Sequence, residues 1–318
     1  MRNKCLTYCF VLLSIQCICI RWGAMALAAM PVASSALHQP SSSARADSIQ
    51  IAAQDPDFVR VSLLTTSAGR KVYSAYGHAA LRLECPSRGL DYCFTFEMAL
   101  TPNEKLRFFL GHPKAGFIAA PTARFLAQYK EEGREVMSYT LNLLPDEEQA
   151  LWRSLDEEMA RGACWDFDVT EHTCTSMVAW VVQKSLRSGT ITYHDLPTEL
   201  ATGTYRDVVD LCSGHAPWSG LFWKTRIGAK GFRHAAPDRM MMPVLMGQVW
   251  MQATIDDAEG HSRPLVLGQG RQLFPSTWQP TATRFTPTRV GAIFALLMCC
   301  MIWWHCNRKR RRLASRRG

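Results

Sequence analysis

The chain has 318 residues, 47% hydrophobic and 20% charged, so its length and composition suit one sizeable folded domain rather than a disordered protein. Its formal net charge is +9, but residues 307–318 carry +7 and residues 1–54 carry +3, which leaves −1 for residues 55–306. Because the positive charge lies at the two ends, it does not indicate a nucleic-acid-binding protein.

The beginning of the chain has the layout of a secretory signal peptide. Basic residues precede a mostly apolar run over residues 5–20, and small residues that suit cleavage follow over residues 24–28. We therefore expect a signal peptide over residues 1–28 and a linker, rich in Ser and Ala, over residues 29–54. Arg21 interrupts the apolar run, so a later cleavage site, an uncleaved anchor and an organellar presequence remain alternatives.

Residues 55–280 have the patterns of a folded domain. Alternating apolar residues predict strands over residues 58–64, 76–84, 92–96, 136–143 and 164–169. Helical spacing and capping residues predict helices over residues 101–111, 122–130, 145–161, 175–187, 205–212 and 242–252. Residues 255–285 have no strong pattern and are expected to lead towards the membrane. Because strands and helices do not alternate strictly, the fold class is predicted to be α+β.

The end of the chain predicts a membrane anchor. Residues 290–304 are uninterruptedly apolar, and flanking residues extend this run towards the ~20 residues that a spanning helix needs. Trp303 and Trp304 suit a membrane interface, and the basic residues after them suit the cytoplasmic side. We predict a transmembrane helix over residues 289–306 and a cytoplasmic tail over residues 307–318, in a single-pass inner-membrane protein with its domain in the periplasm. A helix lying on the membrane surface is the alternative.

The domain has an odd number of cysteines, which leaves at least one unpaired in an oxidising compartment. These are Cys85, Cys93, Cys164, Cys174 and Cys212. Cys85 and Cys93 flank a predicted turn, which favours a bridge between neighbouring strands. A bridge between Cys164 and Cys212 would leave Cys174 as the free thiol.

Cys174 stands immediately before the predicted helix over residues 175–187, and a helix N-terminus stabilises a thiolate. His78 follows Tyr76 and Gly77 on a predicted strand and could act as the base for this nucleophile. Their spacing alone does not distinguish a catalytic pair from a packed cysteine and an ordinary polar histidine. His172 and Cys174 lie outside any HExxH or CxxC pattern, so we expect no metal and no cofactor.

Short motifs elsewhere in the domain carry a resemblance to a known family. They are Val61–Thr65, Tyr73–Arg82 with its Tyr-Gly-His, Thr95-Phe96, Tyr129 with Gly133-Arg134, Leu141–Leu143, Asp166–Asp168 before Cys174, Thr204–Asp207, Pro217-Trp218 and Met241–Met246. In this order, over about residues 58–270, the chain resembles the bacterial periplasmic "domain of unknown function 4105" family.

That family is similar to circularly permuted papain-like proteins of the NlpC type, in which the histidine strand precedes the cysteine helix. The resemblance implies such a fold with helical additions. It also implies Cys174 as nucleophile and His78 as base, with Glu97 or Thr95 as the third member and Glu97 preferred. Tyr76 would line the oxyanion site.

The implied function is that of a membrane-anchored thiol hydrolase or acyltransferase, acting on an amide or ester of a peptidoglycan peptide or a lipid. The chain departs from the family at Thr173, where Asn is common, and around Gly228–Arg233. A non-catalytic envelope-binding module of the same fold therefore stays open. A glycosidase-associated domain is a further alternative, which would need two carboxylates across a groove from among Asp166, Asp168 and Glu171.

Overall fold

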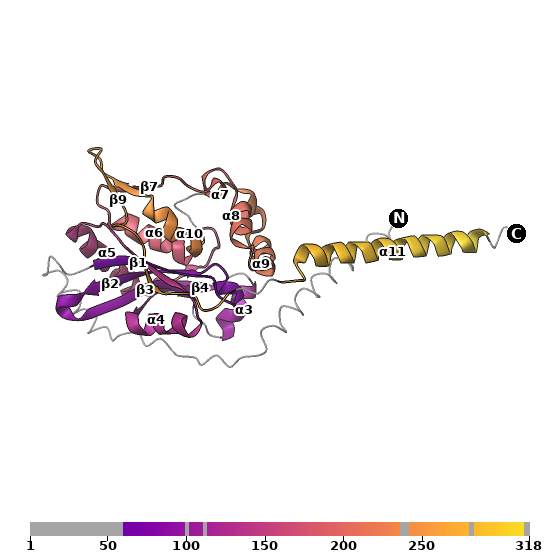
Figure 1. The fold of residues 1–318 in the computed structure, drawn as a ribbon, viewed down its shortest axis with the longest axis horizontal. Helices are drawn as coiled ribbons and strands as arrows, with labels where there is room; N and C mark the ends of the chain where they lie inside the picture. Colours follow the sequence, from indigo (N-terminus) through magenta and orange to yellow (C-terminus); the bar gives the residue numbers. More distant parts are fainter. Residues whose placement is uncertain (1–59, 99–101, 111–112, 236–241, 280–282, 315–318) are drawn as a thin grey trace. The chain divides into compact units, whose positions relative to one another are not determined.

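A seven-stranded sheet, in which every neighbouring pair of strands is antiparallel, forms the centre of the fold (Figure 1). The structure is a computed structural model and describes residues 60–98, 102–110, 113–235, 242–279 and 283–314. In spatial order its strands are β10 (Arg271–Phe274), β5 (Val136–Thr140), β1 (Arg60–Thr66), β2 (His78–Cys85), β3 (Leu90–Met98), β4 (Lys114–Pro121) and β6 (Trp165–Asp166). A smaller sheet contains β7 (Thr190–Thr192), β8 (Thr254–Asp256) and β9 (Ser262–Pro264).

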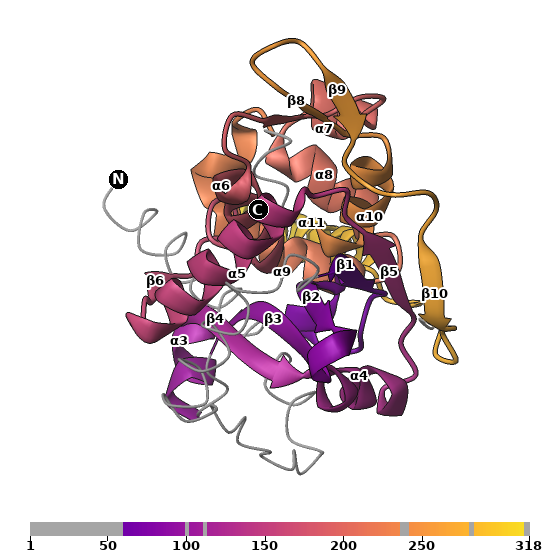
Figure 2. The same cartoon turned by 90° about the vertical axis from the view of Figure 1, so that its left-hand side faces the viewer.

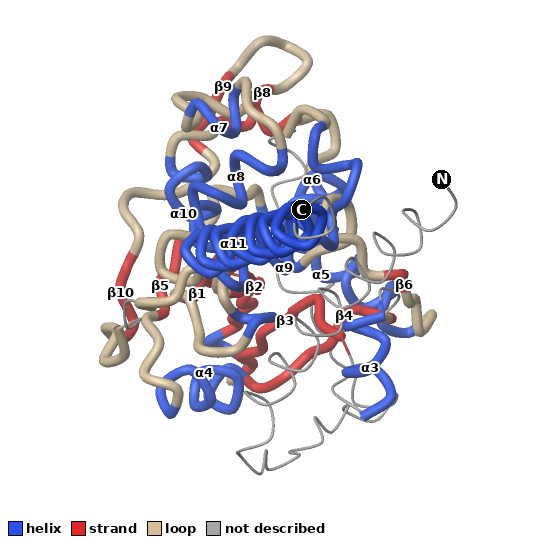
Figure 3. Tube along the Cα trace, turned by 90° about the vertical axis from the view of Figure 1, so that its right-hand side faces the viewer, coloured by secondary structure: helices blue, strands red, loops and turns tan. Residues whose placement is uncertain are grey.

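Helices cover both faces of the large sheet. On one face α5 (Pro145–Ala160) contacts β4, α6 (Cys174–Ser185) contacts β2 and β3, and α10 (Pro243–Met251) contacts β1. On the opposite face α4 (Thr122–Glu131) contacts β3 and β4 (Figures 2 and 3). The remaining helices are α3 (Pro102–Leu110), α7 (Thr198–Ala201), α8 (Tyr205–Cys212), α9 (Pro217–Ile227) and α11 (Pro287–Ala314).

Two apolar cores of different size follow from this arrangement. Strand residues alternate between the faces, so Leu63 packs into the large core under α5, α6 and α10, while Leu64 packs into the small core under α4. Both leucines are completely buried. The central strands are therefore buried on both faces, which fixes their register.

Most predicted elements are present, so the prediction of a mixed α+β domain is confirmed. The predicted helix over residues 175–187 begins one residue earlier, at Cys174, and the strand over residues 136–143 ends at Thr140. Strand β4 was not predicted, because its small residues Ala115, Ala119 and Ala120 give little alternating hydrophobicity. The end residues Thr101 and Gly111 of another predicted helix lie outside the described residues.

The segment of residues 255–285, where the sequence has no strong pattern, is regularly structured over much of its length. It contains β8, β9 and β10, and β10 forms an edge of the large sheet beside β5. The backbone N–H groups of Thr277 and Trp278 both donate to the carbonyl of Gly133, at 2.9 and 3.0 Å. These bonds join the segment to the turn before β5, a long-range pairing that local sequence does not encode.

The predicted bridge between Cys85 and Cys93 is also wrong. Cys93 pairs across the hairpin with Arg82, whereas Cys85 pairs with Leu90. Cys85 packs in the large core and Cys93 in the small one, so the two side chains lie on opposite faces of the sheet. Both thiols are free, as are those of Cys164, Cys174 and Cys212.

Among the described residues one helix is long and apolar enough to cross a membrane. The segment Pro287–Arg308 of α11 has a mean hydropathy of 1.6 and is exposed along its length. It includes the predicted transmembrane residues 289–306. The predicted signal peptide and linker, residues 1–54, lie outside the described residues.

Candidate functional site

Cys174 is the first residue of α6, and the residue before it caps the helix. The Thr173 hydroxyl accepts the backbone N–H of Ser176 at 3.2 Å, and the Ser176 hydroxyl accepts the backbone N–H of Thr173 at 2.9 Å. Threonine is among the residues preferred at a helix N-cap, and this reciprocal arrangement is a capping box. It holds the thiol at the positive end of the helix, where N–H groups lack intrahelical acceptors.

His78 is the first residue of β2, opposite Thr66 on β1. The preceding Gly77 has a φ of +88°, and a Cβ there would collide with the carbonyl oxygen of Thr66. Only glycine allows this approach, because other residues rarely adopt such a φ. Gly77 therefore fixes the position of the His78 backbone, from which the imidazole side chain extends.

Two side chains of β3 contact the same nitrogen of His78. The imidazole Nε2 lies 3.3 Å from the Glu97 carboxylate and within hydrogen-bond distance of the Thr95 hydroxyl. Thr95 and Glu97 are two residues apart and so lie on the same face of β3. Both residues that were predicted as the third member of the catalytic group therefore contact His78.

The thiol of Cys174 forms a side-chain hydrogen bond with His78. Burial would lower the pKa of His78, but the negative charge and hydrogen bond of Cys174, followed by those of Glu97, raise it to about 10. Both neighbours therefore favour the protonated imidazole. Only 17% of the His78 side chain is exposed, while Cys174 is partly exposed.

An aromatic layer from α4 supports the imidazole. The His78 ring stacks on Tyr129 at 6.5 Å between centroids and lies 6.4 Å from Phe125. The Arg134 guanidinium lies over the Tyr129 ring at 4.8 Å and donates to the carbonyl of Ser67. Tyr129 and Arg134 belong to the motifs of the family resemblance but had no role assigned from sequence, although their occurrence beside Gly133 was a usable signal.

The structure does not bring the hydroxyl of Tyr76 to this group. It hydrogen-bonds the Ser213 hydroxyl at 2.7 Å, and the ring packs near Trp223. Burial raises the pKa of Tyr76 to about 12, so the hydroxyl stays neutral. A role in the oxyanion site remains a sequence prediction.

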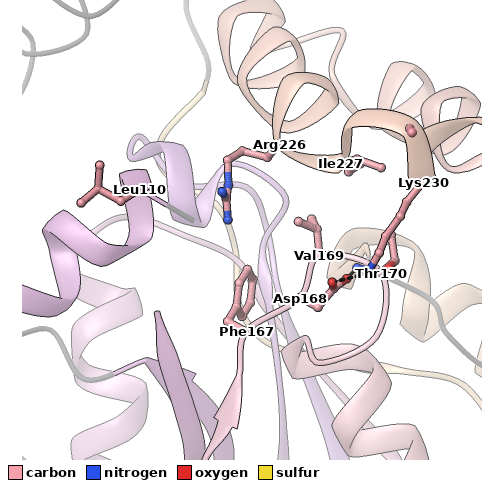
Figure 4. A pocket seen from close by; sticks show the side chains of 9 residues that line it. Leu110, Phe167, Asp168, Val169, Thr170, Arg226, Ile227 and Lys230 are labelled. Atoms are coloured by element: carbon pink, nitrogen blue, oxygen red, sulfur yellow. Dashed lines mark hydrogen bonds and ion pairs between the residues drawn. The ribbon is translucent and has the colours of Figure 1, made fainter. Parts of the chain in front are cut away.

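The acidic residues before α6 face lysines. Asp168 pairs with Lys230 at 2.6 Å (Figure 4). Asp166 pairs with Lys114 at 2.8 Å. Burial would raise the pKa of Asp168, but hydrogen bonds from Lys230 and Thr170 lower it. Paired carboxylates of this kind lack the free acid that a glycosidase needs. Among the described residues, no group of three or more His, Cys, Asp or Glu side chains could hold a metal ion.

Comparisons with known proteins give one match. Residues 46–210, just over half of the chain, match the model of the Lnb N-terminal periplasmic domain. The search of curated proteins and the search of solved structures each gave no match. The matched segment contains His78, Glu97 and Cys174, and together with the apolar helix α11 it is consistent with a periplasmic domain anchored by one membrane span. The chain belongs to the Lnb N-terminal periplasmic domain family of bacterial periplasmic domains.

Proposed function

We propose that this protein is a thiol hydrolase or acyltransferase of the cell envelope, acting on an amide or ester through Cys174 and His78. The observation that carries the proposal is Cys174 at the start of α6, which acts on the His78 imidazole through its charge and a side-chain hydrogen bond, together with the Glu97 carboxylate 3.3 Å from the Nε2 of the same ring. The proposal includes the permuted papain-like architecture and the relation to the "domain of unknown function 4105" family that the motifs imply.

The geometry supports a two-step acyl transfer. The Cys174 thiolate would attack the substrate carbonyl carbon, and the helix N-terminus would stabilise the resulting oxyanion. As the tetrahedral intermediate collapses, the His78 imidazolium would give its proton to the leaving amine or alkoxide, which leaves a thioester on Cys174. Water or an acceptor amine or hydroxyl would then attack the thioester, with His78 removing its proton, and the thiolate would be released.

The pKa of His78 would change during this cycle in a useful direction. The negative charge of Cys174 is the largest influence that raises the pKa of His78. Acylation removes that charge, so the pKa falls and the imidazole becomes available as a base at neutral pH. The same residue can therefore be an acid before acylation and a base after it.

The substrate would lie in the envelope because the family is periplasmic. Peptidoglycan peptides and lipid acyl groups both contain the required amide or ester. The inner membrane would hold α11, with the arginine-rich end of the chain on the cytoplasmic side. Partners other than the substrate and this membrane are not proposed.

The alternative of a non-catalytic binding module predicts a bridged or buried Cys174 with His78 out of reach. The free, partly exposed thiol and its hydrogen bond to His78 favour catalysis instead. The glycosidase alternative is disfavoured by the ion pairs of Asp166 and Asp168.

The test is the labelling rate of individual cysteines in the full chain, in detergent at neutral pH, with an electrophilic thiol probe and peptide-resolved mass spectrometry. Cys164 is an exposed free thiol and serves as the internal reference. We expect Cys174 to react about tenfold faster than Cys164. The His78→Ala variant should lose this advantage, whereas variant His194→Ala, at an exposed histidine that contacts Thr254, should keep it.

Equal rates at the two cysteines, or a Cys174 rate that is unchanged in His78→Ala, would sink the catalytic proposal. If labelling behaves as expected, peptidoglycan peptides and acyl lipids can be screened for cleavage. Cys174→Ala should then reduce turnover by on the order of 10⁴-fold or more.

A further inference from the structure

Arg226, near the end of α9, has no ion pair or hydrogen-bond partner among the residues that the structure describes. Its Nε is buried and has no hydrogen-bond partner within the described part of the chain. Burial lowers the pKa of Arg226, against the opposing influence of Asp168. A buried N–H without an acceptor is costly, and such groups normally have a partner, so the Nε of this half-buried arginine calls for an explanation.

The guanidinium extends from α9 towards Phe167, at a cavity of about 310 Å³ (Figure 4). That volume lies at the lower end of the range for small-molecule sites. The cavity combines apolar walls with a few polar groups. Its lining residues are Leu110, Phe167, Asp168, Val169, Thr170, Arg226, Ile227, Ala229 and Lys230.

The residues that line the cavity have one more positive charge than negative charge. Lys230 donates to one oxygen of Asp168 at 2.6 Å, and the backbone N–H and hydroxyl of Thr170 donate to the other at 2.8 and 2.6 Å. The carboxylate is therefore fully engaged and forms no direct bond with Arg226. One positive charge remains, and it belongs to Arg226.

We propose that this cavity binds the carboxylate or phosphate group of a small, partly apolar molecule, with Arg226 as its anchor. A planar guanidinium suits both oxyanions because it can donate two parallel hydrogen bonds. The Phe167, Val169 and Leu110 side chains would cover the apolar part of the ligand. The neutral isostere of such a ligand would leave Arg226 without an acceptor and bind less tightly.

This site is separate from the Cys174–His78 group. Neither of those residues lines the cavity, and Arg226 and Lys230 lie outside the segment shared with the family. The carbonyl of Asp168 accepts the backbone N–H of His172 at 3.0 Å, so the loop leading to Cys174 forms part of the wall. Binding does not depend on the thiol, and the proposal stands or falls independently of the proposed catalysis.

The experiment is titration calorimetry on the full chain in neutral detergent at low salt, with benzoate, benzamide and inorganic phosphate as separate probes. We expect saturable binding of benzoate or phosphate, and benzamide should bind about tenfold more weakly than benzoate wherever benzoate binds. The variant Arg226→Gln should weaken binding of the anion by about tenfold or more. Arg153→Gln, at an exposed arginine of α5, and Cys174→Ala should bind as the unmodified chain does.

A comparison of the two anions shows whether the natural ligand has a carboxylate or a phosphate group. Preference for benzoate indicates a carboxylate ligand, and preference for phosphate indicates a phosphate ligand. Absence of saturable binding by both anions, or unchanged binding in Arg226→Gln, overturns the proposal. Binding of benzamide as tight as that of benzoate overturns it as well.

A second measurement needs no variant and so does not depend on whether Arg226→Gln folds. Phenylglyoxal modifies accessible arginines, and peptide mass spectrometry can follow each one. The bound anion should slow modification of Arg226 by about tenfold while that of Arg153 stays constant. Equal modification of Arg226 with and without saturating anion contradicts the proposal.

Discussion

The two faces of the large sheet are built differently. The face under α5, α6 and α10 is a broad apolar core that includes Phe94 and Phe96 of β3. The face under α4 has a small apolar core, and the next residues along the same strands are polar. Thr95 and Glu97 alternate with the two phenylalanines, so burial of one face fixes the direction of the polar side chains on the other.

His78 connects these two faces at the end of β2. Its ring stacks on Tyr129 of α4 and contacts Glu97 on that face, yet it also hydrogen-bonds Cys174 at the start of α6, which packs on the opposite face. The Cys174–His78 pair is therefore held by two layers, one on the α4 face and one on the α6 face, which have only the sheet in common. Perturbing each layer separately shows which one determines the chemistry of His78.

The largest expected effect is on the protonation of His78. Because Cys174 contributes most to the raised pKa, Cys174→Ala should move the titration midpoint from about 10 towards the ordinary 6.5. Glu97→Gln should move it in the same direction by less. Removing negative charge destabilises the imidazolium, so both shifts are downward.

Imidazole NMR of the full chain in detergent measures these midpoints. The proton is retained below pH 10 in the unmodified chain and is lost as the pH rises through that value. A larger shift in Glu97→Gln than in Cys174→Ala would show that the α4 face, not α6, controls the charge of His78.

The second largest expected effect is on the free energy of unfolding, and it concerns two neighbouring leucines of β1 that point to opposite faces of the sheet. Leu63→Ala and Leu64→Ala should each lower the free energy of unfolding by about 3 kcal/mol, because both side chains are completely buried. Leu64 packs in the core that contains Phe125 and Tyr129, so only its replacement should also slow labelling of Cys174. Chemical unfolding in detergent gives the first quantity and cysteine labelling the second.

Equal loss of labelling in the two leucine variants would mean that general loosening, rather than the α4 layer, sets the reactivity of Cys174. An exposed control on α5, Arg153→Ala, should change the free energy of unfolding by less than about 0.5 kcal/mol.

Sequence reasoning succeeded where local signals are strong. The strands β1, β2 and β3 lie in strongly apolar runs of the sequence, and the start of α6 is marked by the capping residues Thr173 and Ser176. It failed where a strand is defined by its neighbours. β4 takes its place between β3 and β6, and β10 is placed by the bonds of Thr277 and Trp278 to Gly133.

The candidate site likewise contains some residues that could be predicted from the sequence and others that could not. His78 and Cys174 are far apart in the sequence, and their spacing alone did not distinguish a catalytic pair, so the family resemblance was needed to support it. Thr95 and Glu97 were named through the same resemblance, which places a polar third member on the strand after the histidine, although Glu97 lies just beyond the predicted strand over residues 92–96. The stacking of Tyr129 on His78 and the cation over the Tyr129 ring depend on long-range packing, which no local pattern encodes. The same is true of the buried Arg226 Nε, which has no hydrogen-bond partner among the described residues.

The third effect tests Arg134, which holds the α4 layer in place. Its guanidinium donates to the Thr66 hydroxyl and the Ser67 carbonyl, and its side chain is only 4% exposed. Lysine keeps the charge but cannot reproduce the planar set of donors, so Arg134→Lys should lower the free energy of unfolding by about 2 kcal/mol. The matched control Arg153→Lys should have little effect, and equal unfolding midpoints for the two variants would contradict the assigned role.

The smallest effect concerns the cap of α6, which belongs to the other layer. Thr173→Ala removes the acceptor of the Ser176 N–H and should lower the free energy of unfolding by about 1 kcal/mol. Thr173→Asn restores a capping acceptor and should stay within about 0.5 kcal/mol of the unmodified chain. Labelling of Cys174 should follow the same order, because the cap positions the first turn that carries the thiol. If Thr173→Ala leaves both stability and labelling unchanged, the α4 face alone orders the pair, since the start of α6 would then need no cap to present Cys174 to His78.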